Sequence, residues 1–418
     1  MTSLTASPEI APGLDVDALR AEFPTLAREV HGKPLVYLDS ASSAQRPQCV
    51  IDAVTDFYRR YNANVHRGVH QLSVEASEAF EQSRRTVREY INAASEREIV
   101  FTRGATEAIN LVAQAWARPI LKPGDEIIVS RMEHHSNIVP WQLVCEQTGA
   151  VLKPAPISER GELLVDELEA MIGERTKLIG LVHVSNALGT VNPVEQVCEL
   201  ARRRDIVTVI DGCQALPHAH VDVREIGCDF YAFSAHKMYG PTGIGALYGR
   251  EALLDAMPPW QGGGEMISWV SFEEGTTYNE LPHKFEAGTP NIAGAIGMGA
   301  AFEFLRRVGI DSITRHEADL LAYATERMQA IEGLNIIGTA ERKGPVISFT
   351  IEGIHPNDLG TIVDHHGVAI RTGHHCTMPA MKFFQVPATA RISLGAYSTR
   401  HEIDVFLNAL DRARAMLG

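Results

Sequence analysis

The sequence predicts an α/β protein with two domains: a large one built on a mostly parallel sheet between helices, and a smaller α+β one. The chain of 418 residues is longer than one hydrophobic core usually supports. From about Glu98 to Tyr248, short apolar runs alternate with stretches of helical periodicity, which is the pattern of parallel strands joined by crossover helices. After about Ile292 the pattern changes to helices around one strand, and this change indicates the second domain.

The large domain contains apolar runs of the length of buried strands. Between two of them, the segment 193–204 has an apolar face of helical spacing, with Pro193 in its first turn. Strand–helix–strand crossovers are right-handed and join parallel strands. Because the strands are parallel, their carboxyl ends meet at one edge of the sheet, where such folds bind ligands. The predicted strands are EIIVS (126–130), KLIGLVHVS (177–185), VTVID (207–211) and FYAFS (230–234).

The smaller domain is predicted from the last third of the chain, completed by an N-terminal segment. We expect helices at 295–309, 311–333 and 399–417, and a strand at 346–353. The resulting division assigns residues 1–14 to a disordered lead, 35–295 to the large domain, and 15–34 with 296–418 to the small domain.

Composition narrows the class of protein. The formal net charge is −14, which gives no electrostatic basis for binding nucleic acid or an anionic membrane. No apolar run approaches the roughly 20 residues that span a bilayer. The first residues carry acids and lack the apolar stretch of a signal peptide, so we expect a cytoplasmic protein.

The six cysteines contain no CxxC pair, which argues against a disulfide framework or a structural zinc site. Five of them lie in apolar or helical surroundings and are expected to be small buried hydrophobes. Cys376 lies instead in RTGHHCTMP, where Arg371 and two histidines are close in sequence. Positive neighbours favour a thiolate, so we expect Cys376 to be a nucleophile, with a structural cysteine as the alternative.

Three polar residues, Asn186, Asp211 and Lys237, fall at or just past the ends of predicted strands. A carboxylate and a lysine at neighbouring strand ends suggest pyridoxal phosphate (PLP), in which the lysine forms a Schiff base and the carboxylate keeps the pyridine nitrogen protonated. The alternative is an aspartate that caps a turn and a lysine that reaches solvent.

Other residues could hold the same cofactor. In TRGATEAINLVA, Ala105 and Thr106 open a helix whose N–H groups favour a phosphate, although an ordinary threonine cap has the same pattern. Ser234 and His236 flank Lys237 in sequence and offer further phosphate donors.

His134 and His135 follow the strand 126–130. A histidine at this place could lay its ring on a cofactor, bind a metal or hydrogen-bond within its loop. Zinc is not expected there, because further ligands do not stand at the usual spacing. Gln214 could reach the phenolic oxygen of PLP or be a polar loop residue.

Together these motifs resemble the cysteine desulfurases of the NifS/SufS class, which are fold-type I PLP enzymes. RTGHHC is similar to the group II (SufS-like) signature, whereas DSASSAQRP and GAYST differ slightly from the usual family wording. The segments that carry the resemblance span nearly the whole chain in the expected order: NANVHRGVHQLS, RGATEAINLVA, MEHHSNIVPW, VSNALGTVNP, VIDGCQALPH, FSAHKMYGPTGIG, FEAGTPN and IRTGHHCTMP.

The resemblance implies a fold-type I architecture with a seven-stranded sheet, PLP as cofactor and a role for each matching residue. Lys237 would be the Schiff-base lysine, Asp211 the partner of the pyridine nitrogen and Cys376 the nucleophile. The remaining roles are ring stacking by His134; contacts to the phenolic oxygen by Gln214 and Asn186; phosphate binding by Ala105, Thr106, Ser234, His236 and, from the other subunit, Thr289; substrate carboxylate binding by Arg391 with Asn186; Arg371 beside the nucleophile loop; and His66 and Arg67 supplied by the partner subunit.

The implied activity is removal of sulfur from L-cysteine, which gives L-alanine and a persulfide on Cys376 for iron–sulfur cluster assembly. The resemblance also implies a homodimer with shared active sites and an acceptor protein that is SufE-like or SufU-like. Selenocysteine lyase or a related PLP-dependent lyase is the first alternative, and a non-catalytic sulfur-transfer scaffold is the second.

Overall fold

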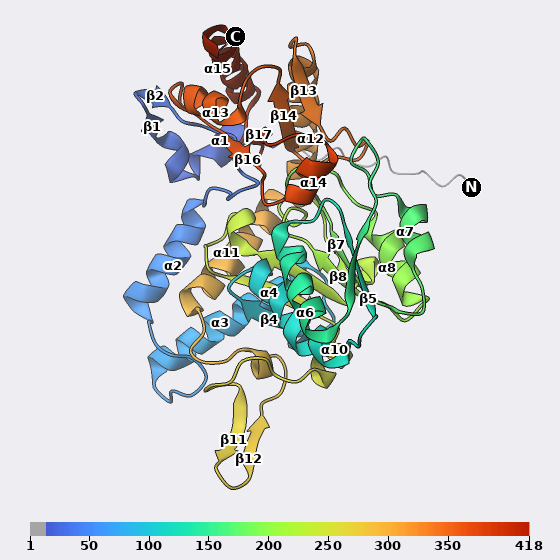
Figure 1. Ribbon diagram of the computed structural model, residues 1–418. Helices are drawn as coiled ribbons and strands as arrows, with labels where there is room; N and C mark the ends of the chain where they lie inside the picture. The colour runs from blue at the N-terminus through green and yellow to red at the C-terminus, as the bar shows by residue number, and fades with distance from the viewer. Residues whose placement is uncertain (1–13, 418) are drawn as a thin grey trace, which may run out of the picture.

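The computed structural model describes residues 14–417 of the chain. Most of the predicted N-terminal lead, residues 1–13, therefore lies outside the described residues. Figure 1 shows the sheet of the large domain in the middle, the small domain above it and a two-stranded hairpin projecting at the far end. Within the described part of the chain, no helix is both long and apolar enough to cross a membrane.

A seven-stranded sheet organises the large domain, in the order β4-β10-β9-β8-β7-β5-β6. β10 runs antiparallel to both of its neighbours, and the remaining pairs are parallel. The predicted mostly parallel sheet is confirmed, and the four predicted strands match β5, β7, β8 and β9 closely. The bounds are β4 Ile99–Thr102, β5 Glu126–Ser130, β6 Val151–Ala155, β7 Thr176–Val182, β8 Val207–Asp211, β9 Phe230–Ser234 and β10 Gly245–Gly249.

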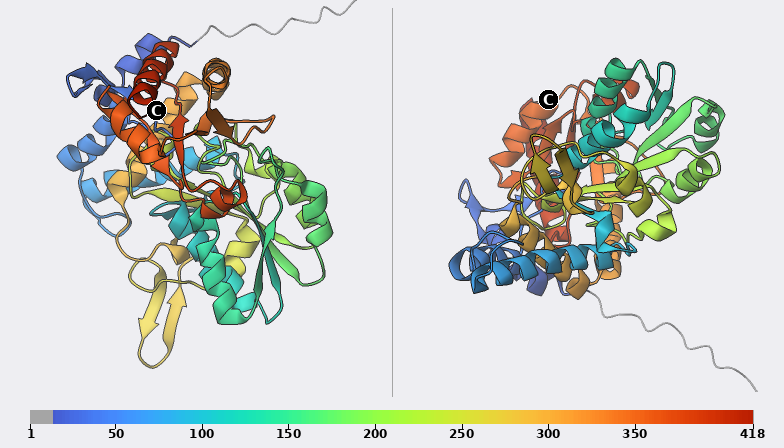
Figure 2. Two further views of the ribbon diagram at one scale, coloured as in Figure 1. Left: turned by 45° about the horizontal axis from the view of Figure 1, so that its top comes forward. Right: turned by 90° about the horizontal axis from the view of Figure 1, so that it is seen from below.

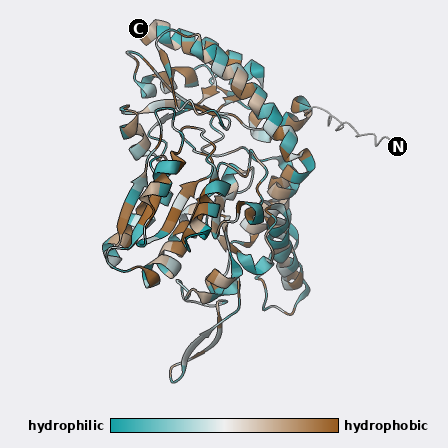
Figure 3. Ribbon diagram, turned by 90° about the vertical axis from the view of Figure 1, so that its right-hand side faces the viewer, coloured by the Kyte–Doolittle hydropathy of each residue, from teal (hydrophilic) through white to brown (hydrophobic). Residues whose placement is uncertain are grey.

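Helices cover both faces of this sheet, because alternate side chains of each central strand point to opposite faces. In β8, Val209 packs under α4 and α6, whereas Ile210 packs in the core shared with α3, α8 and α11. Figure 3 shows brown apolar residues along the sheet and on the inner sides of these helices. The helices of the large domain are α2 Gln48–Arg60, α3 Gln71–Tyr90, α4 Ala105–Leu111, a π-helical continuation Val112–Ala117, α5 Arg118–Ile120, α6 Val139–Thr148, α7 Val165–Met171, α8 Val194–Arg202, α9 Val223–Ile226, α10 Glu251–Ala256 and α11 Ile292–Val308.

The small domain has its own core and a four-stranded antiparallel sheet, in the order β13-β14-β17-β16. Figure 2 shows its helices packed over one end of the large domain. The predicted strand at 346–353 and terminal helix at 399–417 match β14 and α15. The bounds are α1 Val16–Ala21, α12 Ile310–Gln329, β13 Leu334–Ile337, β14 Val346–Ile351, α13 Pro356–Asp364, β15 Val368–Ala369, β16 Arg371–Gly373, α14 Met378–Phe383, β17 Thr389–Ser393 and α15 Arg400–Leu417.

Two contacts join the N-terminal part of the chain to the small domain. β3 (Val36–Tyr37) pairs in parallel with β15, and Asp39 forms an isolated bridge with Ser393. At the other predicted boundary, α11 packs against α2 and α3 of the large domain. The division into domains at residues 35 and 296 stays a prediction.

Candidate active site

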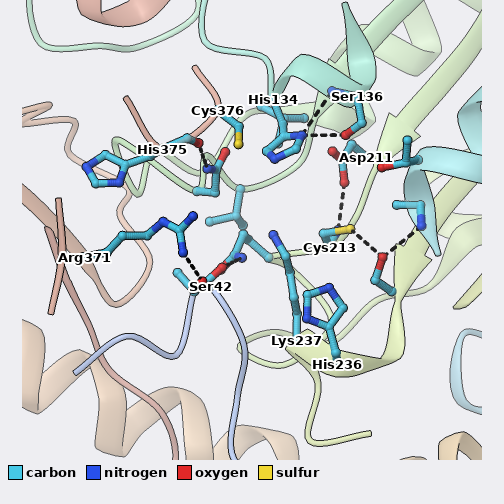
Figure 4. Close-up of a pocket in the computed structure, with 18 of the residues that line it drawn as sticks. Ser42, His134, Ser136, Asp211, Cys213, His236, Lys237, Arg371, His375 and Cys376 are labelled. Atoms are coloured by element: carbon cyan, nitrogen blue, oxygen red, sulfur yellow. Dashed lines mark hydrogen bonds between the residues drawn. The ribbon is translucent and has the colours of Figure 1, made fainter. Parts of the chain in front are cut away.

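A cavity of about 190 Å³ opens where the carboxyl ends of β7, β8 and β9 meet the small domain. Figure 4 shows the side chain of Lys237 extending toward its middle. The structure brings together predicted site residues from several distant segments. The lining comprises Ala41, Ser42, Ala105, Thr106, His134, Ser136, Val182, Val184, Asn186, Asp211, Cys213, Gln214, Ser234, His236, Lys237, Arg371, His375, Cys376 and Arg391.

One end of the cavity is built by the turn from β4 into α4. Gly104 has φ 150°, and a Cβ there would lie 3.0 Å from Ser234 Oγ, so only glycine suits the position. The Ala105 N–H donates to Ser234 Oγ at 2.8 Å, which leaves the serine proton free to donate elsewhere. With Thr106 at the second position of the helix, this end concentrates donors and the positive end of a helix dipole.

The middle of the cavity presents acceptors. Asp211 Oδ1 accepts from the Cys213 N–H at 3.0 Å. The amide groups of Gln214 and Asn186 donate to the carbonyls of Ala41 and His375, at 2.8 and 2.7 Å. Within residues 14–417 their amide oxygens are buried and have no partner. Buried acceptors without partners are costly, so this part of the cavity suits a ligand that donates hydrogen bonds.

His134 lines the cavity from the loop after β5, where it is hydrogen-bonded to Ser136. Its Nδ1 lies 2.6 Å from Ser136 Oγ and accepts from the Ser136 N–H at 3.1 Å. Burial, together with the positive charge of Lys237, lowers the pKa of His134 to about 4. The ring is therefore neutral near pH 7 and can lie flat against an aromatic ligand.

The buried Glu133 fixes that loop to the sheet. Its Oε1 accepts from the Val182 N–H at 3.0 Å and from the Ser130 hydroxyl, and its Oε2 accepts from Asn137 Nδ2 at 2.7 Å. Asn137 is itself oriented by Trp141 Nε1, which donates to Asn137 Oδ1 at 2.9 Å. Burial raises the pKa of Glu133 to about 8 in spite of these donors.

Arg391, on β17, is almost fully buried beside the cavity. Its Nη2 donates to Asp39 Oδ1 and its Nη1 to the Asn186 carbonyl, both at 2.9 Å. Its Nε is buried without a partner in the described part of the chain. Burial lowers the pKa of this guanidinium, and Asp39 opposes that effect. An anion in the cavity would satisfy the free Nε–H and share the positive charge.

Cys376 reaches the cavity from a strained loop between β16 and α14. His375 and Cys376 both adopt left-handed backbone conformations, with φ 52° and 58°. Such residues cost roughly 1–2 kcal/mol each, so other contacts must fix the loop. His375 is buried, its Nε2 lies 2.8 Å from Thr389 Oγ1, and burial lowers the pKa of its ring to about 3. Cys376 is exposed, and Figure 4 shows its sulfur on the same side of the cavity as His134.

Three predicted site residues do not line this cavity. Thr289 lines a separate hollow beside Trp260. His66 bonds to Glu81 at 2.9 Å, and Arg67 to Glu265 at 3.0 Å. All three were expected to act in a partner's site, and that expectation stays a prediction.

Among residues 14–417, His66 also belongs to a group whose geometry resembles a metal site. Ligand atoms of His66, Glu81 and His283 lie within 4.8 Å of one another. Arg84 forms an ion pair with the carboxylate of Glu81, with its Nε 2.8 Å from Glu81 Oε2. The negative charge of Glu81 is therefore already compensated by a guanidinium.

Sequence reasoning missed several residues of the site. Asp39, Cys213, Glu133 and His375 lie in or against the cavity without having been predicted to act there. The sequence prediction that five cysteines are buried is confirmed for Cys198, Cys213 and Cys228. It is wrong for Cys49, which is exposed near the start of α2, and for Cys145, which is only half-buried. A helical apolar pattern does not show on which side of the helix a cysteine falls.

Comparisons with known proteins give matches over nearly the whole chain. The family described as aminotransferase class-V matches residues 36–406. The chain is 52% identical over 414 residues to a "Probable cysteine desulfurase" of Xylella fastidiosa, covering 99% of both chains. It is 51% identical over 403 residues to a "Cysteine desulfurase" of Serratia proteamaculans, covering 96% of this chain and 99% of that protein.

The chain belongs to the cysteine desulfurase branch of the aminotransferase class-V family.

A solved structure in this family supports the fold as well. The crystal structure of the cysteine desulfurase CsdA of Escherichia coli superposes with a TM-score of 0.91, at 39% identity, covering 97% of this chain and 100% of that one. The fold class and the family expected from the sequence motifs are therefore confirmed.

Proposed function

We propose that this protein is a PLP-dependent cysteine desulfurase that removes sulfur from L-cysteine, releases L-alanine and carries the sulfur as a persulfide on Cys376. The observation that carries the proposal is that Lys237, Asp211 and Cys376 line one cavity, although they come from three separate elements. A basic amine, a buried carboxylate and an exposed thiol are the groups that this chemistry requires. A non-catalytic scaffold would not need all three in one place.

Polar groups at two places in the cavity fit PLP. Thr106, Ser234 and His236 would donate to the phosphate beside Ala105 at the start of α4, a setting that favours anions; the Ala105 N–H itself donates to Ser234 Oγ and so orients that hydroxyl. Asp211 would pair with the pyridine nitrogen. When bound, PLP would supply an electron sink for the carbanion that forms on the substrate α-carbon.

The residues of this chain would perform the remaining steps. Arg391 would bind the substrate carboxylate through its free Nε–H, which fixes the amino acid in the cavity. The amine of Lys237 would take the α-proton and later return a proton to carbon. His134, neutral because of its lowered pKa, would cover one face of the ring without adding positive charge.

Cys376 would receive the sulfur. Its thiolate forms a bond to the substrate sulfur while the bond between that sulfur and the β-carbon breaks, and the electron pair of the broken bond stays on the carbon fragment. Protonation of that fragment gives alanine, so no external oxidant or reductant is needed. The exposure of Cys376 would let the persulfide meet an acceptor protein.

We further propose a homodimer in which each subunit completes the other's site. The hairpin of β11 (Ile267–Ser271) and β12 (Gly275–Tyr278) projects from the body in Figures 1 and 3. Apolar side chains of this hairpin are exposed to solvent. Trp269 is 57% exposed, Val270 58% and Phe272 105%. Apolar side chains gathered on an extended hairpin favour burial against another protein surface, and a second copy would bring Thr289, His66 and Arg67 with it.

The dimer is tested by measuring molar mass in solution with light scattering. Trp269→Ser with Phe272→Ser should shift the protein toward the monomer, whereas Met416→Ser, at a side chain that is 71% exposed on α15, should not. A monomeric wild-type protein would reject the shared site.

The acceptor is proposed to be a SufE-like or SufU-like protein that delivers sulfur to iron–sulfur cluster assembly. Adding each purified acceptor to the enzyme and cysteine should raise the rate of alanine release by removing the persulfide. A cytoplasmic location also stays a prediction of the sequence.

The activity itself is tested with the purified protein and L-cysteine. The protein should be yellow, release alanine and gain one sulfur, about 32 Da by its elemental mass, on the peptide that contains Cys376. A colourless protein that does not bind added PLP, or sulfur found only on Cys49, would reject the proposal.

A further inference from the structure

The nucleophile loop makes two contacts with His135, to which neither the family resemblance nor the comparisons give a role. The His135 N–H donates to the Cys376 carbonyl at 2.8 Å. The His135 ring accepts at Nε2 from the Met378 N–H, at 3.1 Å. His135 thus holds the loop on both sides of Thr377.

The second contact satisfies a group that a helix leaves open. Met378 is the first residue of α14, and the first N–H groups of a helix have no partner within it. Thr377, which precedes the helix, makes no side-chain cap; its hydroxyl donates instead to the His374 carbonyl at 2.8 Å. The imidazole of His135 therefore takes the place of an N-cap from another part of the chain.

The role requires a particular form of the ring. Nε2 can accept only when it carries no proton, so the ring must be neutral with its proton on Nδ1. Burial, together with the nearby His374, lowers the pKa of His135, which favours that neutral form.

Hydrogen bonds fix the segment that carries His135 to the sheet. Glu133, two residues before His135, is bonded to β7 and to Asn137, and the ring of the adjacent His134 lines the cavity. One short segment therefore fixes both the ring expected to cover the cofactor and the loop that presents the thiol.

We infer that His135 is a positioning residue: its ring caps the N-terminus of α14 from a distant part of the chain and so sets the place of Cys376 relative to His134. The remaining anchors, from Asn186 to the His375 carbonyl and from His375 to Thr389, hold the loop on its other side. Without the imidazole acceptor, the left-handed conformation at Cys376 loses one of the contacts that maintain it. The consequence for catalysis rests on the proposed function, whereas the structural consequence does not.

The test compares His135→Ala with His135→Gln, whose amide oxygen can still accept from Met378. His135 is only partly buried, so neither change opens a core cavity. Hydrogen exchange at the Met378 amide and iodoacetamide labelling of Cys376 are both read by mass spectrometry. Loss of one hydrogen bond predicts exchange and labelling about five-fold faster in His135→Ala, with His135→Gln close to wild type.

His374→Ala is the matched control, because it removes an exposed imidazole from the loop and leaves both His135 contacts in place. In the PLP-loaded enzyme, kcat should fall in His135→Ala with little change in KM, and His135→Gln should restore it. Exchange and labelling unchanged in His135→Ala, or raised equally in His135→Gln and His374→Ala, would overturn the inference. Failure of desulfurase activity in the wild type would overturn only the proposed function, since the exchange and labelling readouts need no turnover.

Discussion

Replacing Glu133 by glutamine, a change of one atom, should destabilise the protein measurably. Two donors with fixed orientation meet different oxygens of Glu133: the Val182 N–H meets Oε1 and Asn137 Nδ2 meets Oε2. Asn137 cannot turn over without breaking its bond from Trp141. A glutamine has one oxygen, so its NH₂ must face one of these donors in either orientation.

The cost follows from that mismatch. A buried donor left without an acceptor costs about 1–3 kcal/mol. The argument does not depend on the charge of Glu133, because both oxygens of a protonated carboxyl also accept, and its proton can go to the Ser130 hydroxyl. Urea unfolding of the apoprotein, followed by circular dichroism, should show a lower midpoint for Glu133→Gln.

Glu317→Gln is the matched control for this prediction. Glu317 is equally buried, but it has one contact, from His218 Nδ1 at 2.8 Å, and its other oxygen has no partner among the described residues. Its amide can therefore keep the contact. If Glu133→Gln unfolded at the wild-type midpoint, or if Glu317→Gln cost as much, the reasoning about opposed donors would be refuted.

The remaining predictions concern the cofactor, the substrate and pH. A Cβ at Gly245 would lie 2.7 Å from Gly104 Cα, and such overpacking costs about 1–3 kcal/mol. Gly245→Ala should therefore weaken PLP binding by about ten-fold in absorbance titrations. Gly262→Ala should leave PLP binding unchanged, because there is open space around Gly262. Arg391→Lys should lower kcat/KM for cysteine by about 10–100-fold through loss of a charge-assisted hydrogen bond, with the PLP band retained. Burial lowers the pKa of His183 to about 4, so as the pH falls this histidine is protonated in the unfolded chain before it is protonated in the folded protein. The free energy of unfolding should therefore decrease as the pH is lowered from about 6.5 to 4. The decrease should be less steep in His183→Gln.

Each of these has an opposite outcome that would count against it. Equal PLP affinity in the two glycine variants would mean that the turn at Gly104 adjusts freely. An unchanged kcat/KM in Arg391→Lys would mean that the substrate carboxylate is bound elsewhere. A pH slope that is the same without His183 would place the acid sensitivity in other buried histidines.

Much of the fold could be predicted because strand and helix periodicities are local. The run 207–211 coincides with β8, and the predicted helix 193–204 with α8 to within a few residues. The antiparallel direction of β10 could not be read from its sequence, since GALYG has the same apolar character as a parallel strand.

The site could be predicted where a residue stands at a strand end or in a family motif, as Asp211 and Lys237 do. Residues that act through distant contacts gave no such signal. Asp39 pairs with Arg391 across 352 positions of the chain, and His135 caps a helix 243 positions away. Glu133 lies next to His134 in the sequence, but only the fold shows that it is buried and that three donors converge on it.

The most direct test of the central claim is a single-turnover experiment with L-cysteine on Cys376→Ala. The variant should keep the visible absorption band of bound PLP, form no persulfide on the protein and release alanine far more slowly than wild type, whereas Lys237→Ala should lose the band altogether. Alanine released by Cys376→Ala at the wild-type rate would contradict the account, because the sulfur would then leave cysteine without this thiol.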